Sequence, residues 1–136
     1  MTTTEDIHIV LAGGKRVTAN LRHCVIETDQ PKEAGGTNTA PSPFDLFLAS
    51  IGSCAGFYVQ SYLQARNVST EGVSLTEQVE YDANGALASI RITIHLPPSI
   101  PETMHDAIMR AASTCTVKKI LAKEPRLPIL VDTTVV

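Results

Sequence analysis

The sequence predicts an α+β protein in which antiparallel strands accompany one long apolar helix and two shorter helices. Three observations lead to this fold class. Runs that alternate apolar and polar residues, as strands do, occur near the N-terminus and again in the middle of the chain. A strongly apolar segment of helical length separates them at residues 42–67. Two segments with the apolar spacing of a helix follow in the C-terminal third, before a final apolar run.

Near the N-terminus, residues 7–11 and 16–28 predict two strands joined by a turn at Ala-Gly-Gly-Lys, residues 12–15. We expect Cys24, in the second of these strands, to belong to the core. Residues 29–41 are rich in glycine, proline and polar side chains. This stretch is therefore predicted to be a loop, and it is the one loop long enough to carry function.

The central helix is predicted to begin at Ser42 and to end near Asn67. Ser42 suits the N-cap, Pro43 suits the first turn, and Asp45 stands at the carboxylate position of a capping box. Asp45 is also a candidate to orient a cation at an active site, although its position favours capping. Apolar residues occupy nearly every side, which predicts a buried helix. Serines and glycines interrupt the run, which falls short of the roughly 18 consecutive apolar residues of a membrane span.

The second half of the chain predicts a hairpin, two helices and a last strand. Residues 73–81 and 87–96 alternate around a turn with Asn-Gly at its tip. A helix opens at Pro101 and carries Cys115 on its apolar stripe, a further helix covers residues 116–124, and residues 129–136 form the strand. The order is ββ-α-ββ-α-α-β, and residues 1–136 are predicted to form a single domain.

Composition narrows the function classes. The chain has 136 residues and a net charge of −3, so it lacks the basic surface of a nucleic-acid-binding protein. The polar, acidic N-terminus does not resemble a signal peptide, and we expect a cytoplasmic protein that is not a membrane protein. In that compartment cysteines stay reduced unless they carry out redox chemistry. No CxxC or HxxxH spacing occurs, so no metal site or cofactor is predicted.

Cys54 and Cys115 are the candidates for chemistry. Small residues surround Cys54 in "ASIGSCAGFY", which would let a second helix approach closely, and the helix expected to carry Cys115 is the obvious one. Facing thiols on two buried helices can reach the separation that a disulfide requires. The alternative is a pair of inert core cysteines, because free cysteine often behaves as a small hydrophobe. Lys118 and Lys119 could lower a thiol pKa, or they could form the solvated face of the last helix.

Two motifs resemble a known family. The segments "APSPFDLFLASIGSC" at residues 40–54 and "RAASTCTVKKIL" at residues 110–121 are similar to the osmotically inducible protein C / organic hydroperoxide resistance family, OsmC/Ohr. The resemblance implies an intertwined homodimer with long central helices enclosed by antiparallel sheets. It also implies a thiol-dependent peroxidase that reduces organic hydroperoxides, and sometimes hydrogen peroxide. No cofactor is implied, only an external dithiol reductant such as a lipoylated protein.

Carried over by position, Cys54 becomes the peroxidatic thiol and Cys115 the resolving thiol. The sequence departs from the family at the group that activates the first thiol. In the family a glutamate follows the proline that opens the central helix, and it holds an arginine beside the cysteine; here Phe44 follows Pro43 and Asp45 comes one position later. Arg16 is the candidate substitute cation, and Arg22 is a weaker one. Without the charge pair, the pKa of Cys54 is expected to stay near the free-cysteine value of about 8.5.

A second class of function stays open beside the peroxidase. The chain could be a non-catalytic binding protein or an oxidant sensor that uses a cleft at the dimer interface for a small hydrophobic ligand. A homodimer is expected in either case, because one chain of 136 residues has few strands with which to cover an apolar central helix.

Overall fold

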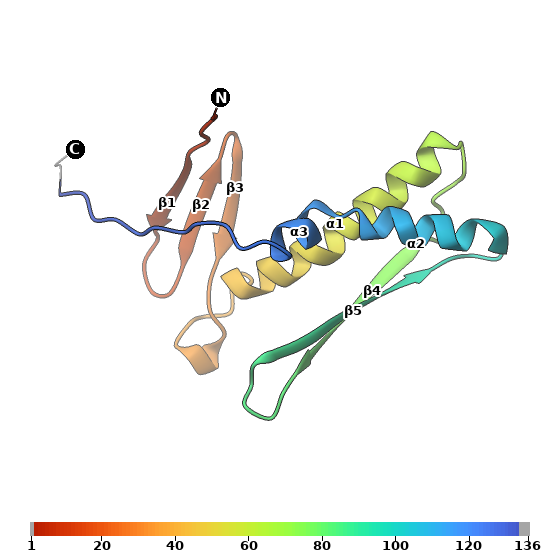
Figure 1. Ribbon diagram of the computed structural model, residues 1–136. Coiled ribbons are helices and arrows are strands. Elements are labelled where there is room, and N and C mark those ends of the chain that lie inside the picture. Colours follow the sequence, from red (N-terminus) through yellow and green to blue (C-terminus); the bar gives the residue numbers. More distant parts are fainter. Residues whose placement is uncertain (1, 134–136) are drawn as a thin grey trace. The chain divides into compact units, whose positions relative to one another are not determined.

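The described part of the chain folds into two compact units, which meet in sequence between Ser50 and Ile51. The structure is a computed structural model, and it describes residues 2–133. Its elements are antiparallel strands and helices, which confirms the predicted α+β class (Figure 1). In chain order they are β1 (Ile7–Leu11), β2 (Val17–Leu21), β3 (Cys24–Thr28), η1 (Lys32–Ala34), α1 (Pro43–Ala65), β4 (Ser74–Tyr81), β5 (Leu87–His95), η2 (Glu102–Met104), α2 (His105–Ser113) and α3 (Thr116–Leu121).

The N-terminal unit contains a three-stranded antiparallel sheet in the order β1-β2-β3. The segment predicted as one strand at residues 16–28 is two strands, because Arg22 adopts a left-handed φ of 52° and turns the chain back. The Arg22 guanidinium also pairs with Glu5 at 2.6 Å. Cys24 is exposed at the start of β3, so its expected place in the core is wrong.

A buried carboxylate organises the loop at residues 29–41. Asp29 is 1% exposed, and it accepts hydrogen bonds from the hydroxyl groups of Thr37 and Thr39, both at 2.7 Å. The backbone N–H groups of Gln30, Thr37 and Thr39 also donate to it. These hydrogen bonds, chiefly those of Thr39, hold the pKa of Asp29 far below its ordinary value. The loop is therefore folded around one charge.

Helix α1 begins with the predicted capping box. The backbone N–H of Ser42 donates to the Asp45 carboxylate at 3.0 Å, and the N–H of Asp45 donates to the Ser42 hydroxyl at 3.1 Å. Both donors would otherwise lack a partner at the helix start. The Asp45 carboxylate is thus committed to the cap.

The rest of α1 is buried along one stripe of its surface. Ile51, Ala55, Val59 and Leu63, spaced four apart, are buried, whereas Phe57 is 60% exposed. The predicted burial on nearly every side is therefore wrong for the chain by itself. By length and composition alone α1 would pass as a membrane span, with a mean hydropathy of 1.2 over its best window, a test that core helices of soluble proteins also pass.

In the C-terminal unit, a long antiparallel hairpin and two helices pack with α1. Strands β4 and β5 pair from Ser74–His95 to Tyr81–Leu87 around a turn in which the Asp82 carboxylate accepts the N–H groups of Asn84 and Ala86. The core is a cluster of four aliphatic side chains from α1, α2 and the loop after β5: Val59, Leu63, Ile100 and Ile108. Figure 1 shows α2 running beside the C-terminal half of α1.

The C-terminal elements differ from the prediction in two ways. The helix expected from Pro101 starts as the 3-10 turn η2, continues as α2 and ends at Ser113, before Cys115; α3 then stops at Leu121. The last strand is also wrong where it can be checked, because residues 129–133 form neither helix nor strand. The remainder of that predicted strand, residues 134–136, lies outside the described residues.

Candidate active site

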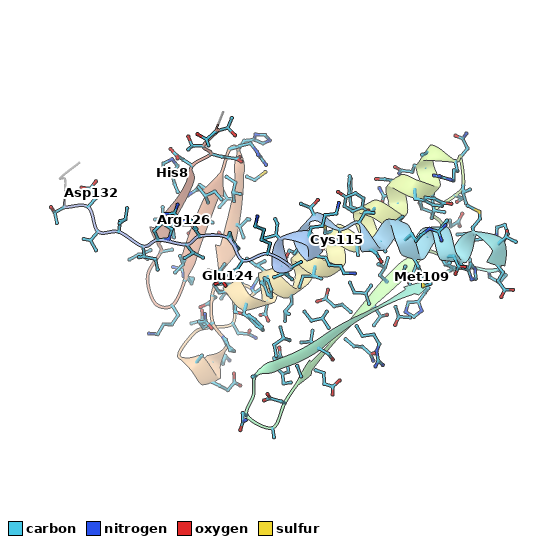
Figure 2. All side chains as sticks on the ribbon, viewed as in Figure 1. His8, Met109, Cys115, Glu124, Arg126 and Asp132 are labelled. Atoms are coloured by element: carbon cyan, nitrogen blue, oxygen red, sulfur yellow. The ribbon has the colours of Figure 1, made fainter. Side chains whose placement is uncertain are left out.

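The two candidate cysteines meet within the C-terminal unit. Cys54 lies half-buried on α1. Cys115, which is labelled in Figure 2, is 2% exposed and directly precedes α3. Cys115 is thus the N-cap residue of a short helix and does not lie on the stripe of the preceding one, as the sequence had suggested. Both thiols are free, and they hydrogen-bond to each other. The Cys115 thiol also lies 4.0 Å from the carbonyl oxygen of Ile51.

The surroundings of the two sulfur atoms push their pKa values apart. The Cys115 thiol and the backbone N–H groups of Val117 and Thr116 stabilise the Cys54 thiolate, and together they lower the pKa of Cys54 against the opposing effect of burial. Burial, and then the hydrogen bond with Cys54, raise the pKa of Cys115. Cys54 is therefore the sulfur that ionises first, with Cys115 as its proton-bearing neighbour.

This result changes the expectation for Cys54. Its pKa was predicted to stay near the ordinary value because the family's charge pair is missing, yet neutral donors alone shift it downward. The first N–H groups of a helix have no partner within that helix, and here two of them reach the sulfur. Sequence reasoning missed Thr116 and Val117 because it carried the preceding helix through Cys115. The Ser113-Thr114 pair, both able to bond to the backbone of the preceding turn, was the available signal for a break.

A side-chain hydrogen bond joins α1 to the residue that follows Cys115. The hydroxyl groups of Tyr58 and Thr116 are 3.0 Å apart. Tyr58 lies one helical turn beyond Cys54 on the same face of α1, so the contact is adjacent to both cysteines. Neither residue was predicted to take part in the site.

The two other predicted site residues lie in the N-terminal unit. Arg16 donates to the carbonyl oxygen of Ala12 at 2.9 Å, within the turn between β1 and β2. It also lines a polar hollow of about 280 Å³ together with Glu27 and Thr39. Asp45 is held in the helix cap. The place of Arg16 in the site accordingly stays a prediction.

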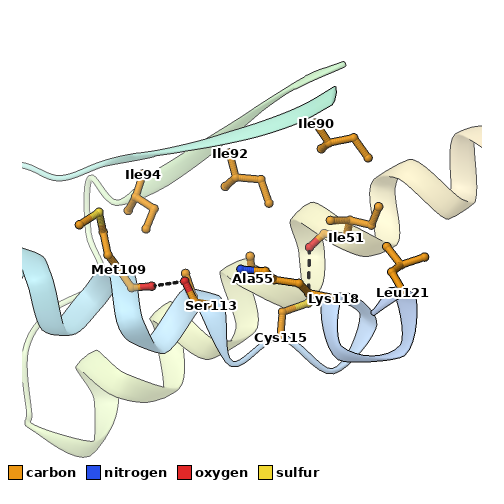
Figure 3. A pocket seen from close by; sticks show the side chains of 11 residues that line it. Ile51, Ala55, Ile90, Ile92, Ile94, Met109, Ser113, Cys115, Lys118 and Leu121 are labelled. Carbon is orange, nitrogen blue, oxygen red and sulfur yellow. Dashed lines mark hydrogen bonds between the residues drawn. The ribbon is translucent and has the colours of Figure 1, made fainter. Parts of the chain in front are cut away.

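An apolar cavity of about 380 Å³ adjoins Cys115. Its walls are mostly aliphatic, and Figure 3 shows three isoleucines of β5 facing the side chains of α1, α2 and α3 across it. Lys118 is the one charged residue among those that line this cavity. The lining residues are Ile51, Ala55, Ile90, Ile92, Ile94, Met109, Ala112, Ser113, Cys115, Lys118 and Leu121.

The two glycines beside Cys54 face the hairpin. A Cβ at Gly52 would strike the Glu77 carboxylate, and one at Gly56 would touch Leu75 at 3.8 Å. The bare backbone therefore accommodates β4 as well as leaving the thiol accessible. Within residues 2–133, His, Cys, Asp and Glu form no group of three or more that could hold a metal ion.

Taken together, the fold and the site define an α+β protein with a pair of hydrogen-bonded cysteines beside an apolar cavity. Residues 36–129 match the OsmC-like protein family, and this match covers more than half of the chain. The chain belongs to the OsmC-like family. No curated protein matches it in sequence.

Solved structures with the same fold are distant in sequence. A protein from Psychrobacter arcticus named for osmotic stress induction and a detoxification response is 20% identical, with a TM-score of 0.74 over 88% of this chain and 89% of that one. An OsmC-like protein from Mycoplasma pneumoniae is 18% identical, with a TM-score of 0.69 over 90% of both chains. An organic hydroperoxide resistance protein from Elizabethkingia anophelis is 22% identical, with a TM-score of 0.58 over 90% and 92%.

Proposed function

We propose that this protein is a thiol-dependent hydroperoxide reductase in which Cys54 attacks the peroxide and Cys115 resolves the product. The observation that carries the proposal is the cysteine pair, in which the pKa of one thiol is lowered and that of its neighbour is raised. Such a pair supplies a nucleophile and a second thiol within reach of it. The names of the structural relatives, three of which refer to hydroperoxide resistance, support the same function.

The proposed reaction has three steps. The Cys54 thiolate attacks the terminal oxygen of the hydroperoxide, the O–O bond breaks, and the alkoxide leaves and takes a proton to become an alcohol. Cys54 is then a sulfenic acid. The Cys115 sulfur attacks it, a disulfide forms, and water leaves. An external dithiol, such as a lipoylated protein, reduces the disulfide and is itself oxidised to a disulfide.

The cavity favours an organic hydroperoxide over hydrogen peroxide. Its aliphatic walls would bury an alkyl group and gain about 25 cal/mol for each Å² removed from water. Arg16 stays the candidate cation of this proposal. We also propose the single domain and the cytoplasmic location expected from the sequence, and the homodimer implied by the family.

Thiol counting tests the proposed function. One equivalent of an alkyl hydroperoxide should consume two thiols rapidly, and peptide mapping should then find Cys54 joined to Cys115. The experiment should use Cys24→Ser protein, because the exposed Cys24 would otherwise add to the count. Loss of no thiol would favour the alternative, a binding protein or oxidant sensor that uses the same kind of apolar site without turnover.

A further inference from the structure

The hydrogen bond between Tyr58 and Thr116 connects the two segments that carry the cysteines. Tyr58 follows Cys54 by one turn of α1, and Thr116 follows Cys115 directly. It adds a hydroxyl–hydroxyl link between α1 and the start of α3 to the contacts that the Cys115 thiol makes with Cys54 and with the Ile51 carbonyl oxygen. Its distance of 3.0 Å is ordinary for a pair of hydroxyl groups.

We infer that Tyr58 and Thr116 are positioning residues, whose hydrogen bond holds the backbone N–H groups of Thr116 and Val117 against the Cys54 sulfur. The inference rests on the proposed function, because it says how the nucleophile of that reaction is kept ionised. In the family a charge pair activates the thiol; here neutral groups take over part of that activation, beside the candidate cation Arg16. Phe44 can then occupy the usual carboxylate position without loss of a reactive thiol.

The geometry makes the role specific. Thr116 is exposed, and no other side-chain hydrogen bond of Thr116 is described. Residues 116–121 form a helix of fewer than two turns, too short to be stable without outside contacts. A hydroxyl–hydroxyl contact at its first residue therefore fixes the part of the helix whose N–H groups face Cys54. A hydrogen bond that served only to hold two helices together could lie at any position along them, whereas this one lies beside the N–H groups that face Cys54.

The groups around the Cys54 sulfur limit what else could set its titration. From the junction before α3 comes the Cys115 thiol, and from α3 come the N–H groups of Thr116 and Val117. Lys118 follows on the same turn and lines the adjoining cavity. On α1 itself, Tyr58 lies one turn beyond Cys54. The groups that lower the pKa of Cys54 all act through hydrogen bonds, so the shift depends on hydrogen-bond geometry, which a loosened α3 would lose.

The experiment measures the pH dependence of Cys54 alkylation in Cys24→Ser protein, with no peroxide present, and compares Tyr58→Phe, Thr116→Val and Tyr62→Phe. Tyr62→Phe is the matched control, since Tyr62 is the next tyrosine on α1 and its ring instead carries the Arg66 guanidinium at 3.7 Å. Loss of one hydrogen bond should raise the Cys54 midpoint by about half a pH unit to one unit in the first two variants. The control should titrate like its parent.

The double variant Tyr58→Phe/Thr116→Val should show no larger shift than either single variant, because both remove the same bond. An unchanged midpoint in Tyr58→Phe and Thr116→Val, with helical circular dichroism retained, would overturn the inference. If one variant fails to fold, the other decides. Since no peroxide is used, this result is independent of thiol counting: a shifted midpoint without peroxide turnover keeps the positioning role and removes the peroxidase.

Discussion

Asp29 and Asp82 both accept backbone N–H groups at a turn, yet only Asp29 is buried. A buried carboxylate keeps its charge only where donors replace its water, and the hydroxyl and N–H groups of the loop do so here. The fold of residues 29–41 is therefore sensitive to a single ionisation.

Replacing Asp29 with asparagine should lower the free energy of unfolding by about 1–3 kcal/mol, because an amide nitrogen would face groups that themselves donate. Chemical denaturation measures the loss. Asp82→Asn is the control, since asparagine suits an exposed turn and should change little. Equal stability in wild type and Asp29→Asn would mean that the charge is not needed.

The pH dependence follows from the same group. Its pKa is depressed in the folded state, so its stabilisation is complete above the unfolded value of about 3.9 and is lost as the pH falls through and below it. Wild-type stability should fall in acid more steeply than that of Asp29→Asn. Parallel acid curves for the two proteins would contradict this.

At the cysteines, Cys115→Ala should raise the pKa of Cys54, because the Cys115 thiol makes the largest contribution to lowering it. Cys115→Ser keeps a donor, so it should raise the pKa less and stall after one turnover at the sulfenic acid, whereas Cys54→Ser should consume no peroxide. Mass spectrometry after chemical trapping should detect the Cys54 sulfenic acid in Cys115→Ser and no sulfenic acid at position 54 in Cys54→Ser. Turnover by Cys54→Ser would discard the mechanism.

Arg16→Ala tests whether Arg16 acts as the cation that stabilises the Cys54 thiolate. If its guanidinium reaches the thiolate in the folded protein, as proposed, the pKa of Cys54 should rise and peroxide reduction should slow. The measurement is thiolate absorbance against pH for both proteins. An unchanged pKa would leave the backbone N–H groups and Cys115 as the whole of the activation.

At the scale of elements, alanine should have opposite effects on the free energy of unfolding at Gly56 in α1 and at Gly36 in the loop of residues 29–41. Gly56→Ala meets ordinary contact with Leu75, so the gain in helix propensity should raise the free energy of unfolding by about 0.5–1 kcal/mol. Gly36→Ala would drive a Cβ into the backbone of Gln30 and should destabilise the protein strongly. Thermal denaturation compares them. A destabilised Gly56→Ala would show that another surface packs there.

The elements also show where sequence patterns suffice. The helix start at Ser42 and the Asn-Gly hairpin were predictable because capping and turn chemistry are local. The break between α2 and α3 was not, since Cys115 continues the apolar spacing of α2 in the sequence, whereas the backbone leaves the helical region at Thr114 (φ −80°, ψ 5°) and at Cys115 (φ −47°, ψ 125°). The break is essential to the site, because the backbone N–H groups of Thr116 and Val117, at the start of α3, become hydrogen-bond donors to the sulfur of Cys54.

At the scale of the whole molecule, large apolar side chains remain exposed on one chain. Phe57 is 60% exposed on α1, and near the C-terminus Ile129, Leu130 and Val131 are 86–90% exposed. Large exposed apolar side chains can contribute to an interaction surface. The proposed homodimer would cover them, which also explains why a pattern predicting all-round burial of the helix failed for one chain.

Light scattering at micromolar concentration should therefore give the mass of a dimer. Phe57→Asp should shift that mass toward the monomer, because a charge would have to be buried at the interface. Gln60→Asp, a charge at an exposed polar position of the same helix, is the control. A monomeric wild-type protein would refute the dimer.

The hydroxyl contact of Tyr58 has an optical consequence. The chain has no tryptophan and three tyrosines, so tyrosine emission is not masked. One of these phenols sits a helical turn from the reactive sulfur, and a disulfide is an efficient quencher of an excited phenol close to it. The oxidation of the cysteine pair should thus be visible as a fall in the protein's own fluorescence, in real time and without a dye.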